Sequence, residues 1–196
     1  RLYEIPWGGS SAIGSLGFVD AAKELARQLG ATGTPVRVYL PCGTMGSVAG
    51  LLAGFAAARV PVTVVAVKVV PQRSVGAAAV LDLAGDVAAL LADSPPREEL
   101  ARRLEFRAEF AGPGYALPTP EAQEALALAR DTEGLRVETT YSAKALACLI
   151  ADARRGLLAG HTPVFWQTWN SQPYPEGLDA VDTSGVPEAF RRFLTA

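Results

Sequence analysis

The alternation of apolar and polar segments along the chain predicts an α/β domain. Short apolar runs have the length and composition of buried strands at residues 36–40, 62–69, 105–110 and 163–168. Between them lie segments with helical spacing of apolar residues: 14–29, 47–58, an alanine-rich stretch that ends at 91, 97–103, 120–130 and 142–155. Strands that alternate with helices are typical of a parallel sheet, so we expect a twisted parallel sheet with helices on both faces.

Capping residues mark several of the expected helix boundaries. Gly30 follows the first helical segment where a C-terminal cap belongs, and Thr119 precedes Pro120 as an N-cap before proline in the first turn. Asp93-Ser-Pro-Pro96 breaks the helical pattern as a turn rather than as a domain linker. We therefore expect residues 1–196 to form a single unit, with the Pro/Gly-rich residues 171–187 on its surface.

The composition favours a folded protein that acts on small molecules. Hydrophobic residues make up 49% of the 196 residues, which is enough for one large core. The 18 Lys+Arg and 20 Asp+Glu residues form no basic footprint for nucleic acid or an anionic membrane. The most apolar stretch, residues 60–70, is too short to span a bilayer.

Cysteine and histidine usage indicates a reduced chain without a metal site. Cys42 and Cys148 are the only cysteines and His161 is the only histidine, and no metal-ligand spacing connects them. We expect both cysteines to be small packing residues in a cytoplasmic protein.

The segment from Val36 to Phe55 predicts a phosphate-binding turn. In Cys-Gly-Thr-Met-Gly-Ser47 the glycines permit a tight turn, the hydroxyls add donors, and the helix that follows presents free N–H groups. The turn lacks the Gly-Lys-[Ser/Thr] of a P-loop and the G-x-G-x-x-G spacing of a dinucleotide site. A mononucleotide or a coenzyme phosphate fits it better, and the plainer alternative is a strand-to-helix turn without a ligand.

Two further loops carry candidate functional tyrosines. Ala111-Gly-Pro-Gly-Tyr-Ala-Leu-Pro118 presents Tyr115, and Thr140-Tyr-Ser-Ala-Lys144 ends one extended run and starts a helix. Ligands of parallel sheets gather at the carboxyl ends of strands, where these loops are expected. Taken singly, each has a simpler explanation: a surface packing tyrosine, a helix-capping serine and a solvated lysine.

Taken together and in order, these segments resemble the fold type II pyridoxal-phosphate enzymes that include D-cysteine desulfhydrase and aminocyclopropane-carboxylate deaminase. Pro6-Trp-Gly-Gly-Ser-Ser-Ala-Ile-Gly-Ser-Leu-Gly-Phe18 resembles the family's Gly-Gly-Ser-Ser segment, and Cys42-Gly-Thr-Met-Gly-Ser-Val-Ala-Gly50 resembles its phosphate loop. Gly112-Pro-Gly-Tyr-Ala-Leu-Pro118 is similar to its Pro-Gly-Tyr-Gly-x-Pro loop, and Tyr141-Ser-Ala-Lys144 to its Tyr-x-Gly-Lys turn.

The resemblance implies pyridoxal 5'-phosphate as the cofactor and assigns roles to particular residues. The phosphate would be held by Gly43, Thr44, Met45, Gly46 and Ser47. Tyr141 would cover a face of the coenzyme ring, and Thr168, or alternatively Ser142, would hydrogen-bond the ring nitrogen. Tyr115 would orient the substrate or move a proton near its α-carbon, so Tyr115 and Tyr141 are the catalytic candidates.

The resemblance also implies a lyase or deaminase that acts on a small amino acid, in a homodimer of the full-length form. Ser142 stands where the desulfhydrase branch has threonine and the deaminase branch has glutamate. This favours elimination of the D-cysteine desulfhydrase kind.

Two departures from the family pattern qualify the expected activity. The family's Schiff-base lysine precedes the Gly-Gly-Ser-Ser segment, whereas the lysines here are Lys23, Lys68 and Lys144, of which Lys144 matches the family's second lysine. We therefore interpret the chain as the C-terminal portion of a longer enzyme and expect it to be inactive alone. Gln167-Thr-Trp-Asn170 replaces the usual His-Thr-Gly-Gly, which leaves the substrate and its enantiomer open.

Two hypotheses of other classes stand beside this one. The chain is then either a non-catalytic coenzyme-binding module, or a nucleotide-binding α/β domain that binds a dinucleotide and ignores pyridoxal phosphate. Fold alone does not separate them, because α/β sheets host many functions.

Overall fold

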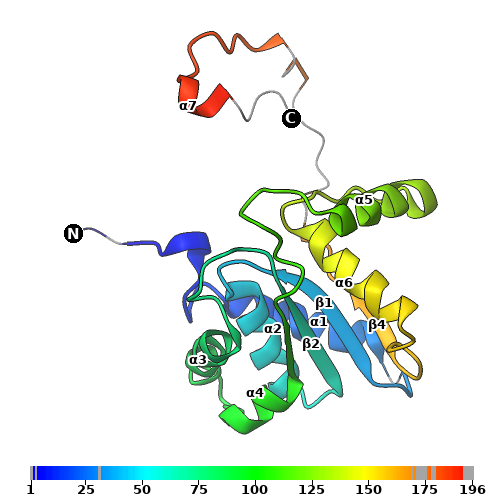
Figure 1. Cartoon of the computed structure of the whole chain (residues 1–196). Coiled ribbons are helices and arrows are strands. Elements are labelled where there is room, and N and C mark those ends of the chain that lie inside the picture. The colour runs from blue at the N-terminus through cyan, green and yellow to red at the C-terminus, as the bar shows by residue number, and fades with distance from the viewer. Residues whose placement is uncertain are drawn as a thin grey trace.

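The computed structural model describes residues 2, 4–30, 32–168, 170, 176–177 and 180–191, which fold around one parallel sheet (Figure 1). In the described residues the sheet has the strand order β3-β2-β1-β4, and each neighbouring pair is parallel. The strands are β1 Val36–Cys42, β2 Val62–Lys68, β3 Leu104–Arg107 and β4 Thr162–Phe165. The helices are η1 Trp7–Gly9, α1 Leu16–Leu29, α2 Gly46–Ala57, α3 Ala77–Ala88, α4 Arg97–Arg103, α5 Pro120–Glu133, α6 Ser142–Arg154 and α7 Glu188–Arg191.

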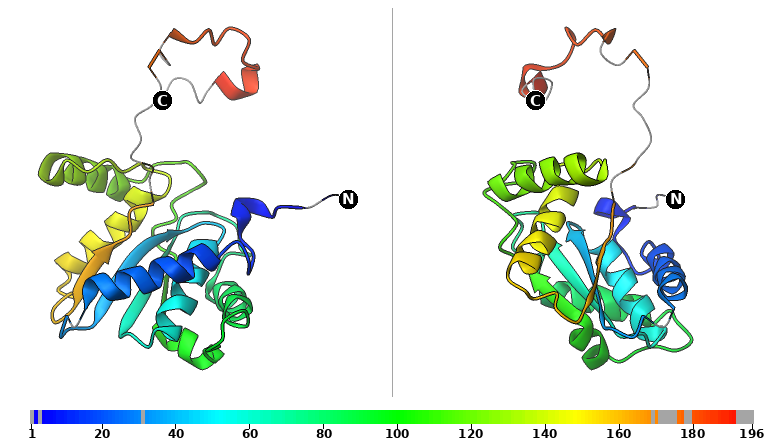
Figure 2. Two further views of the ribbon diagram at one scale, coloured as in Figure 1. Left: turned by 180° about the vertical axis from the view of Figure 1, so that it is seen from behind. Right: turned by 90° about the vertical axis from the view of Figure 1, so that its right-hand side faces the viewer.

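Helices cover both faces of the sheet, and strand alternation decides which residues meet which helices. In β1, Val38 and Leu40 belong to the large core with α1, α2, α3 and α4, whereas Tyr39 faces the other way. On that second face Tyr39 packs with Val65 and with Cys148 of α6. Figure 2 shows α1 and α6 on opposite sides of the sheet, which confirms the expected α/β architecture.

Helix α2 lies so close to α1 that only glycine fits at two of its positions. A Cβ on Gly50 would approach the Ser15 carbonyl oxygen to 2.3 Å, and one on Gly54 would approach the Ala22 Cβ to 2.6 Å. This contact places the N-terminus of α2, and the turn before it, beside the segment that leads into α1.

The structure confirms the expected elements and shifts some of their ends. The predicted strand at 105–110 is β3, Leu104–Arg107, and it stops where its pairing with β2 ends at Val67. The predicted strand at 163–168 is β4, Thr162–Phe165, whose register on β1 ends at Tyr39. Capping by Gly30 and Thr119 is as predicted: the Gly30 N–H donates to Ala26, and Thr119 accepts from Ala122. Of the predicted surface segment 171–187, residues 171–175 and 178–179 lie outside the described residues.

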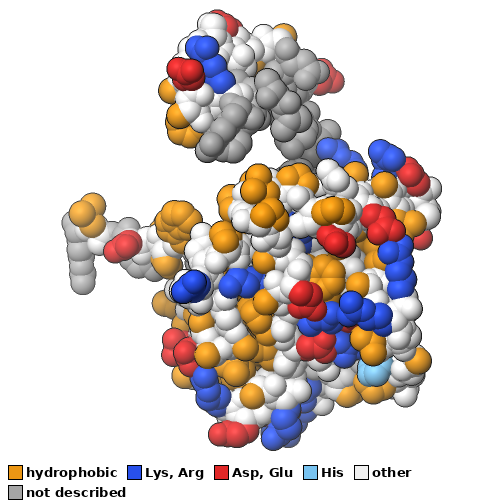
Figure 3. Space-filling view, viewed as in Figure 1, with side chains coloured by type: hydrophobic (Ala, Val, Ile, Leu, Met, Phe, Trp, Pro, Cys, Tyr) orange, Lys and Arg blue, Asp and Glu red, His pale blue; other side chains and the backbone are white. Residues whose placement is uncertain are grey.

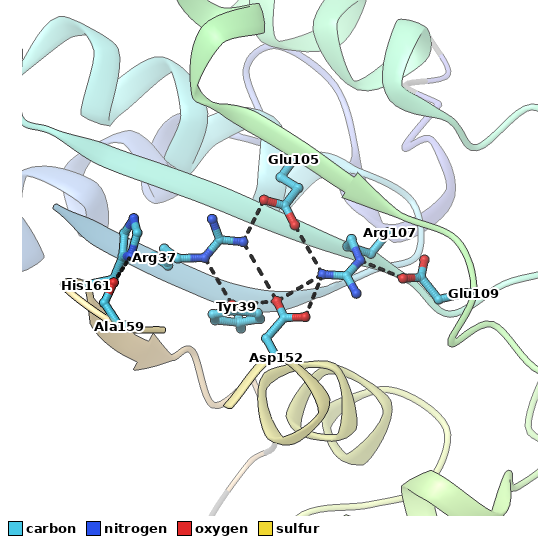
Figure 4. A network of polar contacts seen from close by, with 8 residues as sticks. All are labelled: Arg37, Tyr39, Glu105, Arg107, Glu109, Asp152, Ala159 and His161. Carbon is cyan, nitrogen blue, oxygen red and sulfur yellow. Dashed lines mark hydrogen bonds and ion pairs between the residues drawn. The ribbon is translucent and has the colours of Figure 1, made fainter. Parts of the chain in front are cut away.

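A polar network fastens α6 to the second face of the sheet (Figure 4). Asp152 of α6 is fully buried and accepts hydrogen bonds from Tyr39 Oη at 2.8 Å and from Arg107 Nη1 at 2.9 Å. Arg37 lies 3.7 Å from the same carboxylate and donates to Glu105 at 2.6 Å. Because α6 begins at the candidate site, this network also fixes the position of the site residues on its first turn.

The surface features fit the sequence expectations without extending them. On the face seen in Figure 3, basic and acidic side chains are intermixed. Among the helices of the described residues, none is long and apolar enough to cross a membrane. Within the same part of the chain, no three His, Cys, Asp or Glu side chains gather as metal ligands.

Candidate functional site

A small cavity lies at the carboxyl end of β1, between the turn before α2 and the start of α6. Its volume is about 170 Å³. The cavity brings together the predicted phosphate turn, Tyr141 and Thr168, although Thr168 is 124 residues from Thr44 in the sequence. Its lining residues are Pro41, Gly43, Thr44, Met45, Gly46, Ser47, Val48, Tyr141 and Thr168.

The backbone of the phosphate turn is shaped to present N–H groups to this cavity. Met45, the N-cap of α2, has φ of 73°, a left-handed conformation that residues other than glycine adopt uncommonly. Gly46 then begins α2, whose first-turn N–H groups lie at the positive end of the helix dipole. Thr44 and Ser47 add hydroxyl groups to the same wall. The donor set is therefore that of an anion site.

The Gly-Gly-Ser-Ser segment supports the phosphate turn from outside. Ser10 Oγ donates to Thr44 Oγ1 at 2.7 Å and accepts from the Gly46 N–H at 3.2 Å. A Cβ on Gly8, where φ is 64°, would meet Thr44 Oγ1 at 2.2 Å, and a Cβ on Gly46 would meet Ser10 Oγ at 2.7 Å. The glycines thus let two distant segments pack against each other, and Ser10 is a contact of the turn that motif spacing alone did not assign.

Tyr141 and Tyr115 form a pair at the edge of the cavity. Their phenol groups share a hydrogen bond, and their rings pack edge to face with centroids 5.9 Å apart and an interplanar angle of 75°. Tyr115 is 52% exposed, whereas a Cβ on Gly43 would lie 3.4 Å from the Tyr141 ring. Tyr141 therefore lies against the phosphate turn, and Tyr115 faces solvent beside it.

The environment keeps the phenol of Tyr141 protonated. Burial, followed by the hydrogen bond to Tyr115, raises its pKa well above the usual range. A neutral phenol at physiological pH can donate a hydrogen bond or pass a proton to its partner.

Ser142 is held inside the protein by Glu138. Its hydroxyl donates to the Glu138 carboxylate at 3.0 Å and accepts from the Glu138 N–H at 2.9 Å. The same carboxylate accepts from the backbone N–H groups of Thr140, Tyr141 and Ser142, so it caps the start of α6. Sequence reasoning missed Glu138. Of the two candidates for the ring nitrogen, Thr168 is the one that lines the cavity.

The amines of all three lysines have positions that the structure describes. Lys144 is fully buried and donates to the Ala111 carbonyl at 2.7 Å, and Lys68 donates to the Gln72 carbonyl at 2.9 Å. Lys23 pairs with Asp20 at 3.3 Å on the exposed side of α1. In the sequence-predicted tail of the site, Trp169 lies outside the described residues.

The residues around the cavity fit pyridoxal 5'-phosphate by the chemistry of their donors. Backbone N–H groups and hydroxyls at a helix N-terminus suit a phosphate monoester. The Tyr141 ring beside the turn offers a stacking surface for an aromatic ring, and the Thr168 hydroxyl offers a neutral hydrogen-bond partner.

Comparisons with known proteins agree with this interpretation. The family model described as "Pyridoxal-phosphate dependent enzyme" matches residues 3–166. Nocardicin C-9' epimerase from Nocardia uniformis subsp. tsuyamanensis is 33% identical over 172 residues, which are 88% of this chain and 51% of the relative. D-cysteine desulfhydrase from Salmonella paratyphi C (strain RKS4594) is 31% identical over 150 residues, which are 76% of this chain and 44% of the relative.

Solved structures show the same fold. A crystal structure of an ACC deaminase homologue has a TM-score of 0.67 at 25% identity and covers 82% of this chain and 47% of its own. A threonine deaminase from T.th. has a TM-score of 0.51 at 20% identity and covers 84% of this chain and 61% of its own.

The chain spans about half the length of the curated relatives that it matches. The family match nevertheless covers most of the chain, including the phosphate turn and both tyrosine loops. The chain therefore belongs to the family of pyridoxal-phosphate-dependent enzymes, with the fold type II α/β architecture of its structural neighbours.

Proposed function

We propose that this chain supplies the phosphate loop, the ring contacts and the tyrosine pair of an enzyme that acts on a small amino acid by elimination. D-cysteine desulfhydrase is the relative whose named activity serves as the pattern. The observation that carries the proposal is the cavity itself, because it gathers the turn 43–47, Tyr141 and Thr168 around one space. The proposal includes a cytoplasmic location and a homodimer of the full-length form, as the resemblance implies.

Each residue of the cavity then has a physical task. The turn N–H groups and the Thr44 and Ser47 hydroxyls bind the phosphate, which anchors one end of the coenzyme. Tyr141 packs against the ring, and Thr168 accepts or donates a single neutral hydrogen bond at the ring nitrogen. When bound, pyridoxal phosphate supplies an electron sink for charge at the substrate α-carbon. A neutral hydroxyl protonates the pyridine less firmly than a carboxylate, and this favours β-elimination.

The tyrosine pair is the proposed proton-handling group. Tyr115 is half exposed at the mouth of the cavity, and its hydrogen bond to Tyr141 joins it to the coenzyme side. A substrate bound between them places its α-carbon within reach of the Tyr115 phenol, which then orients it or moves a proton. For D-cysteine the elimination releases hydrogen sulfide, and hydrolysis of the remaining fragment gives pyruvate and ammonia.

A second candidate function is epimerisation at the same α-carbon. The relative with 33% identity is named an epimerase, and its match extends over 88% of this chain. Epimerisation and elimination both begin with loss of the α-proton, so the same residues serve either reaction. Return of the proton to the opposite face gives the epimer, and loss of a β-substituent gives elimination.

We also propose that the lysine that anchors the coenzyme covalently comes from polypeptide outside these 196 residues. The placement of the three lysines supports this, because the Lys144 and Lys68 amines are bonded to backbone carbonyls and Lys23 pairs with Asp20. The residues 1–196 then act as one coenzyme-binding unit without turnover of their own.

The proposal is tested by titrating the chain with pyridoxal 5'-phosphate and with pyridoxal, which lacks only the phosphate. We expect pyridoxal to bind at least about tenfold more weakly, a difference of about 1.4 kcal/mol, because the turn recognises the phosphate. Thr44→Val should weaken binding of the phosphate form alone. The matched control is Thr132→Val, because Thr132 lies on exposed α5, away from the cavity.

Two further measurements separate the alternatives. Intact mass after borohydride reduction should show no stoichiometric adduct on lysine, and an adduct on Lys144 would contradict the proposed origin of the anchoring lysine. Equal affinity for pyridoxal and its phosphate, or tighter binding of NAD than of pyridoxal phosphate, would overturn the coenzyme assignment.

A further inference from the structure

The fully buried lysine of α6 has no part in the chemistry proposed above. Lys144 is 0% exposed, and its Nζ donates to the Ala111 carbonyl oxygen at 2.7 Å. Burial lowers the pKa of this amine, because an ammonium group removed from water loses its hydration. Methionine would fill the same space without that cost, so packing alone does not account for an amine here.

The carbonyl that Lys144 binds stands at the start of the loop that carries Tyr115. Gly112 follows it with φ of 74°, and Ala116 has φ of 59°. The left-handed region is unfavourable for an L-residue such as alanine, so the loop is not the conformation that the segment prefers on its own. External contacts must therefore hold it.

Two contacts attach the loop to the first turn of α6. Lys144 binds the start of the loop at Ala111, and Tyr141 binds its tip through the phenol of Tyr115. Tyr141 and Lys144 are three positions apart, a spacing that places side chains on the same side of a helix. The end of the loop is fixed separately, because Thr119 is the buried N-cap of α5.

We propose that Lys144 is a positioning residue that holds the loop 111–118 against α6 and thereby brings Tyr115 to Tyr141. The inference rests on the proposed function, since the role of the positioned phenol is the one assigned there. Lys144 itself touches neither substrate nor coenzyme in this arrangement.

The test uses the whole chain labelled with 3-fluorotyrosine and read by fluorine NMR without coenzyme. The five tyrosine resonances are assigned by single Tyr→Phe variants. In the parent chain, Tyr141→Phe should shift the Tyr115 resonance, because the two phenols are in contact. In Lys144→Met this response should be lost, while the resonance of Tyr39, buried in the core, stays in place.

Lys68→Met is the matched control, because its amine also donates to a backbone carbonyl but at an exposed loop. It should leave the response of Tyr115 intact. Persistence of the response in Lys144→Met overturns the proposal, and so does absence of the response in the parent chain. Failure to bind pyridoxal phosphate concerns the proposed function only and does not enter this readout.

A second variant decides the case in which Lys144→Met loses the Tyr39 resonance and is unfolded. A Cβ on Gly112 would lie 2.5 Å from Thr119 Cγ2, so Gly112→Ala displaces the start of the loop from the amine and leaves α6 unchanged. Loss of the Tyr115 response in Gly112→Ala supports the proposal, and its persistence overturns it.

Discussion

Replacement of Asp152 by asparagine should destabilise the fold more than any exposed charge change in this chain. The substitution keeps the shape of the side chain and one oxygen acceptor, but it removes the negative charge between two arginines. Arg107 and Arg37 then face a neutral amide, although their side chains are only 12% and 14% exposed. The fully buried position of Asp152 gives water little access to compensate them.

The magnitude follows from what remains in the network. Breaking a buried ion pair by removing one partner costs about 3–5 kcal/mol. Glu105 still lies 2.6 Å from Arg37 and 3.1 Å from Arg107, so the loss belongs at the lower end, about 3 kcal/mol. A domain with a free energy of unfolding of about 5–15 kcal/mol would lose a large share of its stability.

The assay is urea unfolding followed by far-UV circular dichroism, with two comparison variants. Tyr39→Phe removes one hydrogen bond to the same carboxylate and should cost about 1 kcal/mol. Glu124→Gln breaks the pair with Arg154, whose side chains are 52% and 59% exposed, and should have the smallest effect of the three, because solvent screens an exposed pair.

The reasoning is refuted if Asp152→Asn costs no more than Glu124→Gln. It also predicts an effect at the site, because α6 carries Tyr141 at its N-cap. In the folded variant the Tyr115 response to Tyr141→Phe should weaken, since the helix that positions Tyr141 is less firmly attached to the sheet.

The remaining predictions concern the phosphate turn and alkaline stability. Gly46→Ala puts a Cβ 2.7 Å from Ser10 Oγ and should weaken pyridoxal phosphate binding at least about tenfold in the same titration, because the turn must move; unchanged affinity would contradict the assigned cradle. Burial raises the pKa values of Tyr39 and Cys42 to about 12. The unfolded chain then loses these protons first, so the free energy of unfolding should fall as pH rises from about 9 to 12, by up to about 1.4 kcal/mol per unit and group. Urea midpoints measured across this range check it, and a flat profile would count against burial of these groups.

Local chemistry in the sequence was enough to predict the elements and the identity of the phosphate turn. Strand β1 is apolar enough to be recognised alone, and glycines with hydroxyls after a strand have one main physical use, because few other residues allow such a turn. The caps at Gly30 and Thr119 were equally predictable, since a cap depends on the residue and its near neighbours.

The sequence by itself therefore determined the α/β class, the helix and strand periods and the family motifs, all of which act over a few residues. Only the tertiary structure decided the strand order β3-β2-β1-β4, the burial of Asp152 between arginines of β1 and β3, and the contact of Lys144 with Ala111. Ser142 illustrates the difference, because its motif position suggested the coenzyme ring whereas its hydroxyl is bonded to Glu138. Such pairings join residues that the chain brings together only when the core forms, and no local pattern records which polar groups will then be neighbours.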